Sequence, residues 1–167
     1  KASIDCLISV LDGVQSINFN FKDTNGEFVS LNDIQFKDKV VVVQILGTWC
    51  PNCLDETQFF LSYIEENPNE DLAFVGLSVE AAKTEEKAMK RIKNMIDKFN
   101  IPYPILLAQY GGTDKEKFLE KIPMLENIIS YPTTIIIDKS GKVNSIHTGF
   151  NGPARGQAYL DYKKDFK

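Results

Sequence analysis

The sequence predicts an α/β protein in which helices cover both faces of a central mixed β-sheet. Apolar runs alternate with amphipathic helical patterns along the chain, which is the order of a sheet connected by crossover helices. The run at 40–46 is apolar on both faces, as a strand in the middle of such a sheet should be. With 167 residues, the chain is long enough for a substantial core.

An N-terminal β-hairpin extension is expected ahead of this central strand. Residues 17–21 alternate between apolar and polar side chains, as a half-buried strand does. Asn25-Gly26 is a hairpin-type turn, and residues 27–30 form the expected partner strand. A short helical turn is predicted over 31–34.

The middle of the chain predicts two helices and a second central strand. The first helix covers about 50–66, and Asn-Pro-Asn at 67–69 ends it. The strand follows over 72–79, and Thr84 is the predicted N-cap of the second helix. The core face of that helix is a stripe of apolar residues at helical spacing, formed by Ala88, Ile92, Met95, Ile96 and Phe99.

The C-terminal third adds a short strand over 105–107 and a β-hairpin over 133–147. Between them, a helix in two pieces is expected over 113–128, broken at Pro123. A final helix is expected from about residue 152.

We expect one domain over 1–167, because no internal repeat, low-complexity tract or linker interrupts the pattern. Residues 1–16 form a ragged N-terminal extension, and the charged pattern at 161–167 lacks a stop signal, so the last helix is expected to be truncated. The net charge of −4, without a basic stripe, argues against nucleic-acid binding. No pattern demands a partner helix, so we expect a monomer.

Trp49-Cys50-Pro51-Asn52-Cys53 directly follows the central strand and is the most informative segment of the chain. Two cysteines at this spacing, at a strand-to-helix junction, are typical of a dithiol–disulfide exchanger. The N-terminus of the helix carries a partial positive charge and unpaired N–H groups, and both favour a thiolate.

Residues 42–53 resemble the active-site segment of thioredoxin-like proteins, and Tyr131-Pro132-Thr133-Thr134 resembles their cis-proline loop. Residues 141–143 and 147–149 match the hairpin that follows that loop. Glu56, three residues after the second cysteine, is similar to the acid of bacterial extracytoplasmic TlpA/ResA-like (AhpC/TSA-related) thiol–disulfide oxidoreductases. The resemblance covers residue 17 onward and implies a thioredoxin-like three-layer α/β/α sandwich.

The dithiol residues then receive distinct roles. Cys50 is the expected exposed attacking thiolate, and Cys53, one helical turn deeper, attacks the mixed disulfide to release the reduced substrate. Trp49 is expected to pack beside the pair as a contact surface and shield. Pro51 and Asn52 complete this surface, and because both are uncharged the sequence leaves the reduction potential open.

Glu56 is expected on the inward face of the helix, because it shares that face with Cys53 and Phe60. Burial would raise its pKa, and the carboxylate could take the proton of Cys53 as that thiol attacks. In thioredoxins a buried Asp on the strand does similar work, but its position is occupied here by Gln44, which cannot titrate. The alternative is that Glu56 is a solvated helix residue.

The resemblance also implies that Pro132 is cis and holds the backbone of Tyr131 beside Cys50. There Tyr131 would pair with an extended substrate peptide as an added strand. The alternative is an ordinary proline at the start of a strand. His147 is expected to be a strand histidine without a catalytic role, and Cys6 a buried or free thiol.

The leading function is a thiol–disulfide oxidoreductase acting on protein dithiols or disulfides, with no cofactor and no metal. The family resemblance implies reduction outside the cytoplasm, for example of apocytochrome c cysteines, with electrons from a membrane thiol transporter. It also implies a chain that is tethered or part of a longer protein.

Other functions on the same fold remain open. A peroxiredoxin has Thr three residues before the attacking cysteine and a downstream Arg. Here Gly47 occupies the position three residues before Cys50, and Thr48 lies two residues before it. The arginines are Arg91 and Arg155. A copper-delivery module usually spaces its cysteines as C-x-x-x-C. A zinc site would need more ligands than one C-x-x-C pair and a distant histidine. A permanent disulfide is the remaining alternative.

Overall fold

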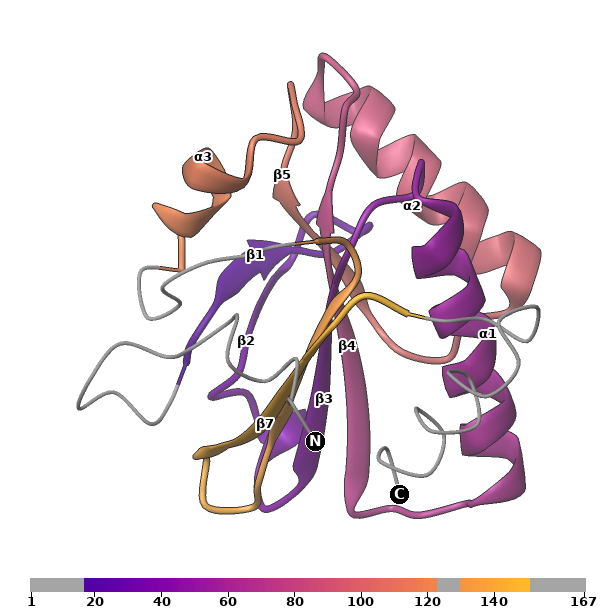
Figure 1. Cartoon of the computed structure of the whole chain (residues 1–167), viewed down its shortest axis with the longest axis vertical. Coiled ribbons are helices and arrows are strands. Elements are labelled where there is room, and N and C mark those ends of the chain that lie inside the picture. The colour runs from indigo at the N-terminus through magenta and orange to yellow at the C-terminus, as the bar shows by residue number, and fades with distance from the viewer. Residues whose placement is uncertain (1–16, 123–129, 151–167) are drawn as a thin grey trace.

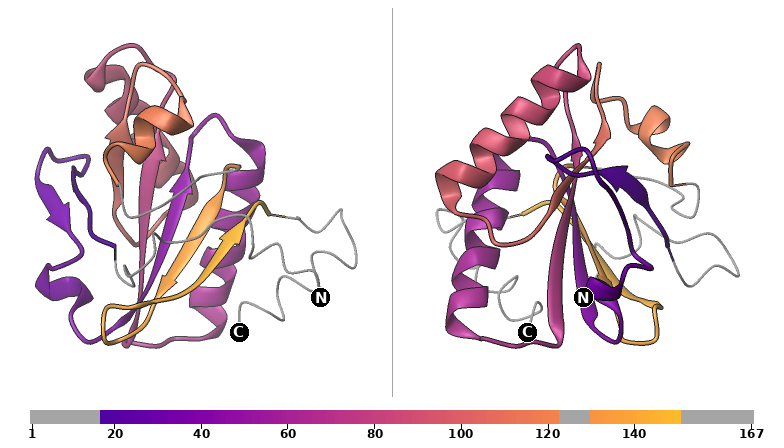
Figure 2. Two further views of the ribbon diagram at one scale, coloured as in Figure 1. Left: turned by 60° about the vertical axis from the view of Figure 1, so that its left-hand side comes forward. Right: turned by 180° about the vertical axis from the view of Figure 1, so that it is seen from behind.

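The computed structural model describes residues 17–122 and 130–150. In these ranges a mixed sheet has the strand order β2-β1-β5-β4-β3-β6-β7. Helices α1 (Pro51–Glu66) and α2 (Glu85–Phe99) lie on one face of the sheet, and the short α3 (Lys115–Leu119) lies on the other (Figure 1; Figure 2). The predicted α/β/α sandwich around a mixed sheet is therefore confirmed.

The sheet is parallel in its middle and antiparallel towards its edges. Its strands are β1 (Asn20–Lys22), β2 (Phe28–Ser30), β3 (Val40–Leu46), β4 (Leu72–Val79), β5 (Ile105–Gln109), β6 (Thr133–Ile137) and β7 (Val143–Thr148). Strand β4 pairs in parallel with β3 and β5, while β6 pairs antiparallel with β3. The β1–β2 hairpin joins the sheet at β5, and the β6–β7 hairpin forms the opposite edge.

Both faces of β3 are covered, as its apolar sequence predicts. Alternate residues in 41–45 pack in one cluster with Phe118 of α3. Val42 and Leu46 point to the other face, where they join the clusters formed with α1 and α2. Because side chains alternate along a strand, Gln44 also points to the α1 face, although it is polar.

The two long helices begin as predicted. Cys50 is the N-cap of α1, with an extended backbone, and Pro51 occupies the first turn, where a missing N–H costs nothing. The Thr84 side chain caps α2 by accepting a hydrogen bond from the Lys87 N–H. Helix α2 ends at Phe99, and the following C-cap residue, Asn100, has a left-handed backbone (φ 52°) that stops the helix.

Several boundaries differ from the sequence predictions, among them β2, which begins at Phe28 rather than 27, and α3, which begins at Lys115 rather than 113. Strand β1 begins at Asn20 rather than 17, because the Asn18 side chain accepts the N–H of Phe19 at 2.9 Å and competes with strand pairing. The helical turn η2 covers Ile34–Phe36 rather than 31–34. Strand β5 continues to Gln109 rather than ending at 107.

Several expectations fall wholly or partly outside the described residues. They concern the extension over 1–16, Cys6, the second piece of the 113–128 helix, and the final helix from 152. A single domain over 1–167 also stays a prediction. No helix in the described ranges combines the length and the apolar content that crossing a membrane requires.

Candidate active site

The C-x-x-C pair lies where β3 ends and α1 begins, and the structure shows both cysteines as free thiols. Cys50 Sγ accepts a hydrogen bond from the N–H of Cys53 at 3.3 Å, so the sulfur caps the helix. Cys53 is fully buried, as expected for the deeper thiol. Cys50 is only 5% exposed, so the expectation of an exposed thiol is wrong. Its Sγ lies 3.8 Å from the carbonyl oxygen of Tyr131, which comes from the loop before β6.

The surroundings of the two thiols shift their pKa values in opposite directions. A hydrogen bond with Cys53, together with the N–H groups of Cys53 and Asn52, lowers the pKa of Cys50 to about 7, although burial opposes this. The same thiol–thiol hydrogen bond and burial raise the pKa of Cys53. Cys50 is therefore the group that becomes a thiolate near neutral pH, while Cys53 stays protonated.

Glu56 is fully buried one turn after Cys53, so it is not a solvated helix residue. Its Oε1 accepts hydrogen bonds from Gln44 Nε2 at 3.0 Å and from Thr134 Oγ1 at 2.7 Å. The negative charge of Glu56 contributes to the raised pKa of Cys53, which places the carboxylate within electrostatic reach of that thiol. Three elements, β3, α1 and β6, therefore meet at this carboxylate.

Gln44 connects this carboxylate to the helix backbone. Its Nε2 also donates to the Cys53 carbonyl oxygen at 3.3 Å, and its Oε1 accepts from Thr57 Oγ1 at 3.1 Å. The Thr57 hydroxyl lies 2.9 Å from the same carbonyl oxygen. Sequence reasoning treated Gln44 only as a group that cannot titrate. The signal for its structural role was that it is the single polar residue in an otherwise apolar strand.

The Tyr131–Pro132 peptide bond is cis, as the resemblance implies. Tyr131 is half-buried, and its hydroxyl donates to the Thr113 carbonyl oxygen at 3.3 Å. Burial raises the pKa of Tyr131 to about 12, so the hydroxyl stays protonated at neutral pH. Its ring meets Trp49 edge to face, with centroids 5.4 Å apart.

Trp49 forms part of the surface beside the dithiol, where it is 42% exposed. Its Nε1 donates to the Val79 carbonyl oxygen at 2.8 Å, which fixes the indole against the end of β4. A Cβ on Gly47 would overlap the indole ring, so this position requires glycine. Pro51 and Asn52 are exposed next to it, as expected for contact residues.

A second buried carboxylate, which the sequence analysis missed, supports the segment before the dithiol. Glu80 is fully buried and accepts the N–H of Thr48 at 2.9 Å and the Thr48 hydroxyl at 2.7 Å. It also accepts the hydroxyl of Ser78. Glu80 thus connects the β3–α1 junction to the end of β4. The sequence feature that could have indicated this role is the position of an acidic residue directly after a buried strand.

His147 lies on β7 directly opposite Thr134, so the two side chains lie on the same face of the sheet. Within residues 17–122 and 130–150, no three His, Cys, Asp or Glu side chains are grouped so that they could hold a metal ion.

This sheet, with a dithiol at the start of α1 and a cis-proline loop beside it, defines a thioredoxin-like thiol–disulfide oxidoreductase. The sequence profile of the AhpC/TSA family matches residues 13–146. The chain belongs to this family.

Known relatives agree with this class. The chain is 30% identical over 142 residues to the thioredoxin-like protein YneN of Bacillus subtilis, covering 85% of this chain and 74% of YneN. It is 26% identical over 141 residues to the thiol-disulfide oxidoreductase ResA of the same organism, covering 84% and 69%. A thiol-disulfide oxidoreductase from Bacteroides fragilis shares the fold, with a TM-score of 0.65, 16% identity, and coverage of 92% of this chain and 100% of that one.

Proposed function

We propose that this protein is an extracytoplasmic reductase of protein disulfides, in which Cys50 is the nucleophile and Cys53 the resolving thiol. The observation that carries the proposal is the contrast between the two thiols. Cys50 caps a helix with its pKa lowered to about 7, while the fully buried Cys53 has a raised pKa. An attacking thiol is most effective when its pKa lies near the ambient pH.

The reaction proceeds in two exchange steps. The Cys50 thiolate attacks one sulfur of the substrate disulfide, whose S–S bond breaks as a mixed disulfide forms on Cys50. The other substrate sulfur leaves as a thiolate and takes up a proton from solvent. Cys53 then loses its proton and attacks Cys50, so that the Cys50–Cys53 bond forms and the second substrate thiolate leaves and is protonated. The substrate gains two electrons from the dithiol and two protons, which balance the proton that Cys50 lost on ionisation and the proton that Cys53 loses in the second step.

Glu56 is the proposed base for the second step. The Cys53 thiol is buried and its pKa is raised, so water is a poor acceptor for its proton, whereas the Glu56 carboxylate is buried nearby. Gln44 and Thr134 hold that carboxylate through one of its oxygens. These residues therefore act as positioning residues for the proton acceptor.

The substrate chain is proposed to lie along Tyr131 and Pro132, pairing with the backbone of Tyr131 as an added strand. Trp49, Pro51 and Asn52 supply the surrounding contacts. In line with the family resemblance, we propose that the protein acts outside the cytoplasm. We also propose that it is a monomer, because no sequence pattern demands a partner helix. Its electrons would come from a membrane thiol donor, and its substrates include cysteines of the apocytochrome c type.

Trapping with single-cysteine variants tests this proposal. Cys53→Ser is expected to accumulate a mixed disulfide with a model substrate protein, detected by mass on a non-reducing gel, because no thiol resolves it. Cys50→Ser should form none. Normal turnover by Cys53→Ser would contradict the two-thiol mechanism.

A redox titration followed by Trp49 fluorescence tests the direction of electron flow. A midpoint near the thioredoxin value of about −270 mV supports a reductase, whereas one near −120 mV indicates a disulfide donor.

A further inference from the structure

A groove between α1 and α2 adjoins the dithiol and has no part in the exchange steps. Its volume is about 360 Å³, at the small end of ligand pockets (roughly 300–1,000 Å³). Its apolar lining comes from Trp49, Leu54, Met95 and Phe99. Trp49 directly precedes Cys50, and Leu54 directly follows Cys53. A chain whose sulfur reaches Cys50 therefore passes within reach of this groove.

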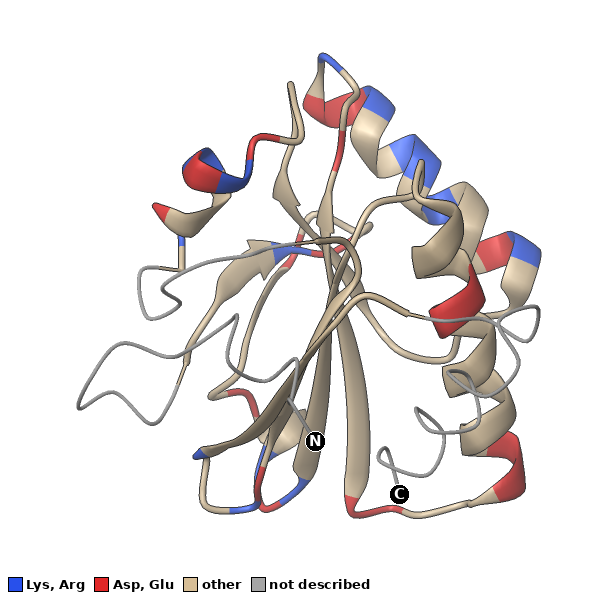
Figure 3. Ribbon diagram, viewed as in Figure 1, with Lys and Arg blue, Asp and Glu red and all other residues tan. Residues whose placement is uncertain are grey.

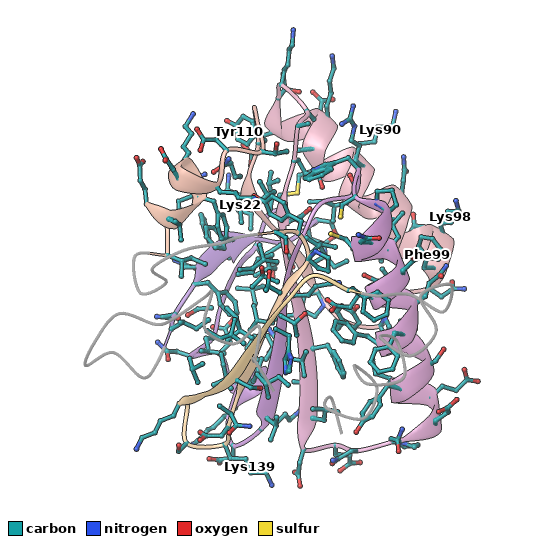
Figure 4. The ribbon with its side chains drawn as sticks, viewed as in Figure 1. Lys22, Lys90, Lys98, Phe99, Tyr110 and Lys139 are labelled. Carbon is teal, nitrogen blue, oxygen red and sulfur yellow. The ribbon has the colours of Figure 1, made fainter. Side chains whose placement is uncertain are left out.

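The charged side chains that line the groove are both cations. Arg91 and Lys98 lie at its rim, no acid lines it, and both side chains are exposed. Neither forms a salt bridge within the described ranges. Lys98 Nζ lies 5.4 Å from the centroid of the Phe99 ring, so a cation stands next to the apolar lining. In Figure 4, Lys98 and Phe99 occupy the same end of α2, and Lys90 lies nearer the other end.

This positive charge is local. The chain carries a net charge of −4, yet α2 has five basic residues and three acidic ones. Figure 3 shows the basic residues along α2, on the side of the molecule that also carries α1. A positive patch on an acidic protein steers partners of opposite charge.

We propose that the groove binds a segment of the redox partner protein that carries an apolar side chain next to an acidic residue, close to the reacting cysteine. The proposal rests on the function proposed above. The apolar side chain lies between Trp49 and Phe99, and the carboxylate pairs with Arg91 or Lys98. Trp49 lines the groove and also contacts Tyr131, so the indole connects the groove to the place proposed for the substrate chain.

Peptides with a single cysteine, activated as neutral 2-pyridyl disulfides, test this proposal. The Cys50 thiolate forms a mixed disulfide with the peptide and expels pyridine-2-thione, whose absorbance reports the second-order rate. One peptide places Leu and Glu beside the cysteine, and a matched peptide places Leu and Lys there. The acidic peptide is expected to react about three- to tenfold faster at low salt, and the difference should shrink at 1 M salt.

The variant Arg91→Glu/Lys98→Glu should reverse this preference. The matched control is Lys90→Glu/Lys93→Glu, which changes the charge of the same helix by the same amount. Both control lysines are exposed and lie outside the groove lining, about 100° and 160° around the helix from Arg91. The control should keep most of the preference for the acidic peptide.

The outcomes separate this inference from the proposed function. Bis(2-hydroxyethyl) disulfide is small and uncharged, so its reduction reports the exchange chemistry alone. If the wild-type protein reduces it but treats the two peptides alike, the groove is not a docking site. An equal loss of preference in both double variants would assign the effect to net charge and also overturn the inference. If the wild-type protein does not reduce the small disulfide, the proposed function itself fails.

Discussion

Replacing Cys53 by Ala should raise the pKa of Cys50. The hydrogen bond with the Cys53 side chain is the largest cause that lowers the pKa of Cys50 to about 7. Alanine removes this bond, so the pKa should rise towards its ordinary value of 9.0. The backbone N–H groups of Cys53 and Asn52 remain and continue to favour the thiolate.

The size of the effect depends on pH. With a pKa of about 7, roughly half of Cys50 is thiolate at pH 7, whereas a pKa of 9.0 leaves about 1%. This is a ~50-fold difference in thiolate, but a thiolate of lower pKa is intrinsically less nucleophilic, by roughly six- to tenfold over two pKa units. At full reversion the variant would therefore react about fivefold more slowly at pH 7. Above pH 10, Cys50 is ionised in both the wild-type protein and the variant. The order then reverses, and the variant reacts faster.

Alkylation by iodoacetamide is measured between pH 5 and 10 by mass spectrometry of the Cys50 peptide. The midpoint of each curve gives the pKa of Cys50 in the wild-type protein and in the variant. The background carries Cys6→Ser, so that only the dithiol contributes. Cys53→Ser is the matched control, because its hydroxyl retains a hydrogen-bond donor and should keep the midpoint near 7. If Cys53→Ala has the wild-type midpoint and its curve does not cross the wild-type curve, the assigned origin of the low pKa is wrong.

Two further variants test the buried carboxylates. Glu56→Gln should slow disulfide exchange about 100-fold and flatten its pH dependence without unfolding the protein, because the amide cannot accept the Cys53 proton. Glu65→Gln, an exposed acid on the same helix, is the control, and equal pH profiles for the two variants would remove Glu56 from the mechanism. Thr48→Val should cost about 1–3 kcal/mol in urea unfolding, because buried Glu80 loses a hydroxyl donor. Thr48→Ser should restore most of that stability, and a Val variant as stable as wild type would show that this hydrogen bond contributes nothing.

Much of the arrangement around the dithiol could be predicted because it depends on short sequence spacings. The hydrophobic periods of the two segments predicted that the dithiol lies at the junction of β3 and α1. The three-residue separation from Cys53 predicted that Glu56 lies on the inward face of the helix. The cis peptide bond before Pro132 was predicted from the resemblance of Tyr131-Pro132-Thr133-Thr134 to the cis-proline loop.

The remaining features depend on contacts between distant parts of the chain. Glu80 meets Thr48 across 32 residues because β3 and β4 pair in register, with Leu46 opposite Ser78. Cys50 is less exposed than its place at a helix start suggests, because Tyr131 approaches it from 81 residues away. Periodicity within one element cannot reveal such contacts.

The 5% exposure of Cys50 determines which disulfides can be attacked at all. In-line attack requires the substrate sulfur to come into contact with Cys50 Sγ, between the Tyr131 backbone and the exposed end of the dithiol helix. A disulfide at the tip of a loop or in an unfolded segment can be brought there. A disulfide enclosed in a folded core cannot, whatever its reduction potential. For the proposed reductase, we therefore expect substrates to be selected first by how far their sulfurs protrude, and structural disulfides inside folded proteins to be spared.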